Sequence, residues 1–202
     1  RGPDELKDLP QYFGRKAIAL DMSKYDVLIF AEIVEAPQIS VEQILTRARA
    51  YKNDGADVID LGCLPSTPFP HLAEAVKALK AEDYKVSVDS METDDLICGG
   101  KAGADYLLSL NEHTVWVADE VASTPVLIPA QPGDMASLER AMQAMQSKGR
   151  AFFADAILDP IHFGLTDSIL RYSALRRKFP DVQIMMGIGN LTELTDADTT
   201  GI

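Results

Sequence analysis

The chain has 202 residues, with 19 Lys or Arg against 31 Asp or Glu, so its formal net charge is −12. That charge argues against nucleic acid or an anionic membrane as the main partner, because both are themselves negative. Apolar residues make up 47% of the chain, which excludes disorder for its bulk. No apolar run approaches the roughly 20 residues of a membrane helix, and two cysteines are too few for a disulfide framework. We therefore expect a folded, cytoplasmic protein.

The first 25 residues form a segment of their own. An apolar run at 16–20 predicts a short strand, but it lies too close to the next strand for a parallel crossover. We expect residues 1–25 to be an N-terminal extension, or a segment that closes the floor of the domain formed by residues 26–202. The chain has no initiating Met and stops at Ile202, so we expect it to be a piece of a longer chain.

From residue 26 on, strand-like and helix-like runs alternate. The strand-like runs are apolar on both faces, as in a buried parallel sheet, and span 26–34, 58–64, 85–89, 106–110, 125–130, 152–159 and 183–188. Helical periodicity fills the intervals at 41–53, 71–82, 92–102, 114–122, 135–148 and 167–179. The first of these helices follows a capping box, in which Ser40 precedes Gln43 by three residues.

Two architectures compete for this pattern. A doubly wound sheet usually has a Gly-rich phosphate turn after its first strand, and here that turn is VEAP at 34–37, without glycine. A (β/α)8 barrel places polar residues just past its strand ends, and almost every predicted strand here is followed by one. We therefore predict a TIM-type (β/α)8 barrel with a parallel sheet, whose eighth βα unit lies beyond Ile202.

Carboxylates and carboxamides dominate the predicted strand ends, which a barrel brings together at one mouth. Such a rim suits a neutral heterocycle rich in hydrogen-bond donors better than a bare phosphate. Asp89, Asn111 and Asp159 are the central candidates. Each could merely cap its own loop, as Asp and Asn often do. Because all three follow consecutive or near-consecutive strands, we favour a common site.

At this point the sequence resembles a known family. The second predicted strand reads GADVIDLG (55–62), followed by PSTP (65–68), and the third reads VSVDS (86–90). Asn111 follows the fourth strand, and LDP (158–160) with FG (163–164) follows the sixth. In order and spacing these motifs resemble those of dihydropteroate synthases, within the pterin-binding (β/α)8 barrel group that also contains corrinoid methyltransferases.

The resemblance implies a set of site residues. Asp89, Asn111 and Asp159 would hold the pterin ring, and Asn190 would join them as in the methyltransferase branch. Four further residues would serve a second substrate or a phosphate: Glu32, Ser66, Thr67 and His162. Glu32 is also the candidate ligand for Mg²⁺. The family further implies a small-molecule pterin substrate and a homodimer.

The sequence also departs from ordinary dihydropteroate synthases. Glu32 stands near the place of a first-strand Asn, and Pro68 follows Thr67 where the family usually has Arg. The seventh strand ends GIGN (187–190) instead of with the Ser-Arg-Lys sequence whose Lys touches the pterin. The pterin pocket therefore looks retained, while the machinery for the second substrate looks altered.

Three functions follow from this pattern. The first is a transferase that joins a dihydropterin-CH2-pyrophosphate to an arylamine in folate or modified-folate (tetrahydromethanopterin-type) biosynthesis. The second is a pterin-dependent methyltransferase, favoured by Asn190. The third is a non-catalytic pterin-binding protein, favoured by the missing Lys and Arg.

Overall fold

The computed structural model describes residues 27–192, so the segment 1–25 and its predicted strand lie outside the described residues. Seven strands are present in this part: β1 (Phe30–Ile33), β2 (Val58–Gly62), β3 (Lys85–Asp89), β4 (Tyr106–Leu110), β5 (Thr124–Leu127), β6 (Phe153–Ala154) and β7 (Gln183–Ile184). The α-helices are α1 (Val41–Asn53), α2 (Leu72–Ala81), α3 (Thr93–Ala102), α4 (Val117–Glu120), α5 (Met135–Ser147) and α6 (Leu165–Lys178). Short 3-10 helices lie at Ala36–Gln38 (η4) and Ile188–Thr192 (η5).

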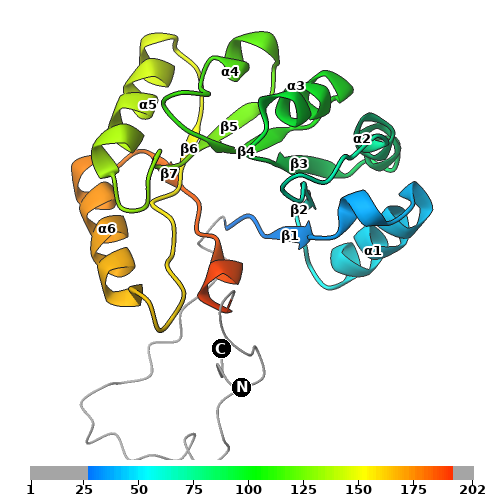
Figure 1. Ribbon diagram of the computed structural model, residues 1–202, viewed down its shortest axis with the longest axis horizontal. Helices are drawn as coiled ribbons and strands as arrows, with labels where there is room; N and C mark the ends of the chain where they lie inside the picture. Colours follow the sequence, from blue (N-terminus) through cyan, green and yellow to red (C-terminus); the bar gives the residue numbers. More distant parts are fainter. Residues whose placement is uncertain (1–26, 193–202) are drawn as a thin grey trace, which may run out of the picture.

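The strands form one sheet in sequence order, and every neighbouring pair is parallel. Figure 1 shows this sheet bent into an arc, with the helices along its outer side and η5, in red, near the open side. Sequential parallel strands inside a ring of helices define the TIM-type barrel. The predicted fold is confirmed: the described residues form six βα units and a seventh strand of such a barrel, with β1 and β7 as the sheet edges.

Local sequence explains where the first helix begins. Ser40 Oγ accepts a hydrogen bond from the Gln43 backbone N–H, and Gln43 Oε1 accepts one from the Ser40 N–H, so the predicted capping box is confirmed. The bounds of β3 and β4 also match the prediction.

The strands predicted at 152–159 and 183–188 are much shorter than expected. β6 ends at Ala154 because the chain turns at once: Asp155 Oδ1 accepts from the Ile157 N–H at 2.7 Å, and Ile157 has φ 61°. A left-handed backbone at a β-branched residue breaks an extended strand. The strand predicted from the apolar run at 152–159 is therefore longer than β6.

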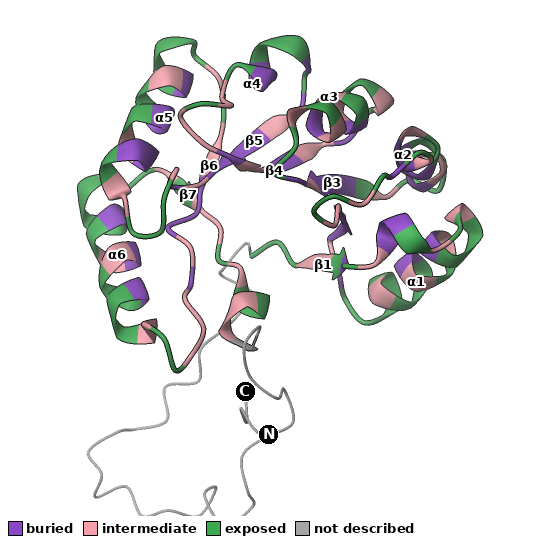
Figure 2. Cartoon of the chain, in the orientation of Figure 1, coloured by how far each residue is buried: buried purple, intermediate pink, exposed green. Residues whose placement is uncertain are grey.

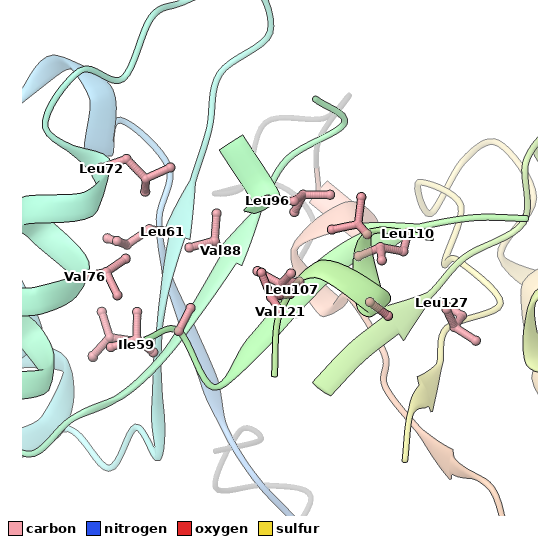
Figure 3. Close-up of a cluster of buried hydrophobic side chains, with 14 of the residues drawn as sticks. Ile59, Leu61, Leu72, Val76, Val88, Leu96, Leu107, Leu110, Val121 and Leu127 are labelled. Carbon is pink, nitrogen blue, oxygen red and sulfur yellow. The ribbon is translucent and has the colours of Figure 1, made fainter. Parts of the chain in front are cut away.

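The main core lies between the outer face of the sheet and the helices (Figure 2), where the buried side of each helix faces inward. Figure 3 shows Ile59 and Leu61 of β2 packed near Leu72 and Val76 of α2. None of the helices in residues 27–192 is long and apolar enough to cross a membrane.

Aromatic rings pack against one another across the inner face of the sheet, near the start of the strands. Tyr106 of β4 packs edge-on against Phe30 of β1, with centroids 5.2 Å apart, and against Phe153 of β6 at 5.7 Å. Because side chains alternate along a strand, the next inward positions lie one layer higher, toward the carboxyl ends. That layer carries polar side chains.

Candidate active site

Three carboxylates gather on the inner face of the first three strands. Glu32 of β1 is in register with Asp60 of β2, and Asp89 ends β3 beside Gly62. One carboxylate oxygen from each of Glu32, Asp60 and Asp89 lies within 4.8 Å of the others. We call these three residues the carboxylate cluster.

Small and hydroxyl-bearing neighbours hold the carboxylate cluster in place. Ser87 Oγ donates to Asp60 Oδ1 at 2.6 Å, and Ser109 Oγ donates to Asp89 Oδ1 at 2.6 Å. A Cβ at Gly62 would stand 2.4 Å from Glu32 Oε1, so the glycine leaves the space that the Glu32 carboxylate occupies. The cluster is thus built by the sequence of β2 and its neighbours.

Burial and mutual repulsion act strongly on these acids. Asp60 is only 4% exposed, and this burial raises its pKa well above the usual value, with the charges of Asp89 and Glu32 adding to the effect. Burial also raises the pKa of Asp89, against the opposing hydrogen bond from Ser109. Such a group of acids favours either bound protons or a cation.

A further acid follows β6. Asp155 is 8% exposed and accepts hydrogen bonds from the Tyr172 hydroxyl on α6 and from the Ile157 N–H. Burial raises the pKa of Asp155, and the charge of Asp89 contributes in the same direction. Asp155 therefore belongs to the same electrostatic environment as the carboxylate cluster.

Most of the strained backbone in residues 27–192 lies at this end of the sheet. Ser66 (φ 56°), Ser109 (φ 68°) and Ile157 (φ 61°) are left-handed although none is glycine, and each lies in or after the carboxyl end of a strand, whereas Asp83 (φ 62°) lies before β3. Ser109 sits where the pairing of β4 with β5 shifts between Leu107 and Leu110. Strained residues of this kind persist where a site needs a particular geometry.

The predicted pterin residues fall into two groups. Asp89 lies in the carboxylate cluster, and Asn111 follows β4 in a turn where its Oδ1 accepts from the His113 N–H at 2.9 Å. Asp159 lies beyond β6, and Asn190 lies in η5 after β7. The Ile161 N–H donates to the Leu191 carbonyl at 3.1 Å, which joins the loop after Asp159 to η5.

Asp159 is held from α6. Its Oδ2 accepts from Arg171 Nη2 at 2.8 Å and from Ser168 Oγ at 2.9 Å, and its backbone N–H donates to the same hydroxyl at 2.8 Å. The Arg171 guanidinium lowers the pKa of Asp159, with Ser168 acting in the same direction. Asp159 is therefore an ionised carboxylate, in contrast to the buried acids of the cluster.

Of the predicted second-substrate residues, only Glu32 lies in the carboxylate cluster. Ser66 and His162 are exposed, and Thr67 Oγ1 donates to the Pro65 carbonyl at 3.4 Å within its own loop.

Sequence reasoning missed Asp60 and Asp155. Asp60 lies inside an apolar strand, and a charged residue at an inward position of a buried strand is a usable signal. Asp155 was hidden because the apolar pattern continued past it to Leu158, which moved the predicted strand end to Asp159.

The cavities described here lie at the opposite end of the sheet. One of about 410 Å³ lies around the turns before β4 and β5, and one of about 540 Å³ is lined by residues before and at the start of β6 and β7. Neither includes a predicted site residue.

Sequence comparisons identify little by themselves. No family model matches the chain. An uncharacterized protein of Methanocaldococcus jannaschii is 30% identical over 201 aligned positions, which cover 89% of this chain and 38% of that protein. The chain thus spans well under half the length of this relative.

Solved structures of dihydropteroate synthases match the fold of this chain. Dihydropteroate synthase from Vibrio fischeri matches with a TM-score of 0.62 and 16% identity, over 79% of this chain and 72% of that one. The Yersinia pestis enzyme, solved with a pterine-sulfa conjugate, matches with 0.61 and 17%, over 82% and 72%. The Coxiella burnetii enzyme, in complex with pteroic acid, matches with 0.58 and 15%, over 79% and 72%. The chain is therefore a TIM-type α/β protein, and its fold is that of dihydropteroate synthases.

Proposed function

We propose that this chain binds a dihydropterin at the carboxyl ends of its strands and acts as a dihydropteroate synthase-like transferase. The observation that carries the proposal is Asp89. It ends β3 on the inner face, its carboxylate is oriented by Ser109, and it lies among acids that favour bound protons or a cation. The shared fold supports the same location.

Pterin recognition follows from the hydrogen-bonding groups at this end. The ring carries an amino group beside a ring N–H, and a carboxylate can accept from both in parallel. Asp159, which Arg171 keeps ionised, suits that role, and Asp89, Asn111 and Asn190 add acceptors and donors from neighbouring strand ends. These four residues are the proposed pterin ligands.

The carboxylate cluster fits a divalent cation. Its ligand atoms are carboxylate oxygens, the hard donors that Mg²⁺ prefers, and they lie close enough to share one ion. Bound there, Mg²⁺ would screen the negative charge of a pyrophosphate that the cluster itself would repel. Glu32, Asp60 and Asp89 are the proposed ligands.

In the proposed reaction the arylamine nitrogen attacks the methylene carbon of the pterin substrate. The new C–N bond forms as the C–O bond to pyrophosphate breaks, the electron pair leaves with pyrophosphate, and the ammonium proton passes to solvent. The residues of the chain bind and orient the two partners, so most of the acceleration would come from positioning and charge stabilisation. Ser66, Thr67 and His162, on loops at the same end, are proposed to meet the second substrate or its phosphate.

The transferase is tested by incubating the chain with the pterin pyrophosphate, Mg²⁺ and either 4-aminobenzoate or a ribosyl-aniline phosphate. Pyrophosphate release that depends on the amine, with formation of the C–N product, is expected. Use of the ribosyl-aniline phosphate would favour a modified-folate pathway. Pyrophosphate release without the amine, or none with either amine, would contradict a transferase.

A pterin-dependent methyltransferase is the second candidate, because Asn190 follows β7 where the synthases have Lys. Methyl loss from a methylated tetrahydropterin to a corrinoid, with no reaction of the pyrophosphate, would favour it. Cytoplasmic location and a homodimer complete the proposal.

A further inference from the structure

One face of α6 contacts the loop that carries Asp159. Ser168, Arg171 and Tyr172 have the i, i+3, i+4 spacing that places side chains on one side of a helix. Ser168 and Tyr172 are buried, and the Arg171 side chain is only 15% exposed. All three contact the segment between Asp155 and Asp159.

Arg171 makes the most extensive of these contacts. Its Nη2 donates to the Ile157 carbonyl at 2.8 Å and to Asp159 Oδ2 at 2.8 Å, and its Nε lies 3.3 Å from the Ala156 carbonyl. One guanidinium thus fixes both the strained backbone at Ile157 and the carboxylate that follows it. The planar fork of Arg suits this task, and a Lys ammonium would satisfy only part of it.

Gly164 completes the arrangement from the start of α6. A Cβ at this position would lie 2.9 Å from Asp159 Oδ2, and the backbone has φ 148°, which side-chain-bearing residues rarely adopt. Arg171 and Ser168 therefore hold the Asp159 carboxylate, and the missing Cβ at Gly164 leaves room for it.

We propose that Arg171 is a positioning residue of the pterin site, which orients the Asp159 carboxylate for the ligand without touching the ligand itself. The inference rests on the proposed function, since it assumes that Asp159 meets the pterin. It assigns a role to a helix residue outside every motif that the sequence resemblance contains.

A double-mutant cycle separates this role from a merely structural one. Affinity for 7,8-dihydropterin is measured by calorimetry for the full chain, for Arg171→Gln, for Asp159→Asn and for the double variant, with thermal stability recorded for each. If Arg171 acts through Asp159, Arg171→Gln weakens binding about tenfold or more in the wild-type background, as expected for loss of charge-assisted positioning. In the Asp159→Asn background it changes the affinity little.

Arg150→Gln is the matched control. Arg150 also donates to two backbone carbonyls, those of Val121 and Ser123, but it lies before β6 and has no contact with Asp159. We expect this variant to lose stability and to bind the pterin as the wild type does.

The inference would be overturned if the double variant lost affinity by the product of the two single-variant losses, or if a folded Arg171→Gln bound the pterin with wild-type affinity. Should Arg171→Gln fail to fold, Arg171→Lys takes its place in the same cycle. It is expected to lose about threefold in affinity, because one ammonium cannot replace the fork, and equal affinity to the wild type would overturn the inference. A wild-type chain that binds no dihydropterin would instead contradict the proposed function.

Discussion

Glycine at position 62 illustrates how single residues shape this site. The backbone there passes so close to Glu32 that any side chain would displace its carboxylate. Glu32 and Asp89 were predicted as site residues from their strand-end positions, and the structure brings them together. Asp60 joins them through strand register, which pairs Glu32 of β1 with Asp60 of β2.

Gly62→Ala should impair cation binding more than folding. The added Cβ would meet Glu32 Oε1 at 2.4 Å and the Val34 Cα at 3.2 Å, and the flexible Glu32 side chain can move away more easily than the backbone. We expect a loss of unfolding free energy of about 1 kcal/mol and a clear loss of the stabilisation that millimolar MgCl2 gives the wild type in thermal unfolding. An unchanged response to Mg²⁺ in this variant would contradict the ligand role of Glu32.

Among the elements, prediction succeeded where a signal was local. The capping box located α1. The helical period at 92–102 located α3, which ends at Gly103 in the left-handed conformation. The lengths of β6 and β7 were overestimated because apolar residues continue past their last paired positions. The turn at Asp155 and Ile157 ends β6, and Tyr172 of α6 holds Asp155 there. The position of the strand end decides which acid is expected at the site. Because the sixth strand was predicted to run to residue 159, Asp155 was not recognised as a site residue.

Close approach of α3 to its neighbours depends on a pair of glycines. A Cβ at Gly100 would lie 2.7–2.9 Å from three atoms of Val121, and one at Gly99 would lie 2.6 Å from Val88 Cγ2. Gly100→Ala should therefore destabilise the fold by about 1–3 kcal/mol from overpacking, despite a gain of up to about 1 kcal/mol in helix propensity. Chemical denaturation measures the difference.

Cys98→Ala is the control for this prediction. Cys98 is exposed on the same helix, so the change alters propensity without crowding a neighbour. The overpacking account would be wrong if Gly100→Ala proved as stable as Cys98→Ala.

At the scale of the whole molecule, buried acids make stability depend on pH. The pKa of Asp60 is higher in the folded protein than in the unfolded chain, so the folded state holds a proton that the unfolded state releases. Its contribution is complete below the unfolded pKa of about 3.9 and is lost as pH rises through the folded pKa. Asp89 and Asp155 act in the same direction, while Asp159, with its lowered pKa, acts in the opposite one.

Asp60→Asn should therefore gain stability relative to the wild type as pH rises. Without divalent cations, we expect the difference in unfolding free energy to shift in favour of the variant by about 1–3 kcal/mol between pH 4 and pH 8. Asp54→Asn, at the exposed end of α1, serves as the control for the removal of one carboxylate. If the difference in unfolding free energy between Asp60→Asn and the wild type stayed constant with pH, the raised pKa of Asp60 would be contradicted.

The most direct test of the account is calorimetric binding of 7,8-dihydropterin to the wild type, Asp159→Asn and His162→Ala. An ionised carboxylate that accepts two N–H donors contributes about 1.5–3 kcal/mol per bond. His162 is exposed, so water competes for any hydrogen bond that it makes to a ligand. We predict that the wild type binds, that Asp159→Asn weakens binding at least about tenfold, and that His162→Ala changes it little. Unchanged affinity in Asp159→Asn with binding lost in His162→Ala would contradict the assigned pocket, and no binding by the wild type would contradict the pterin site itself.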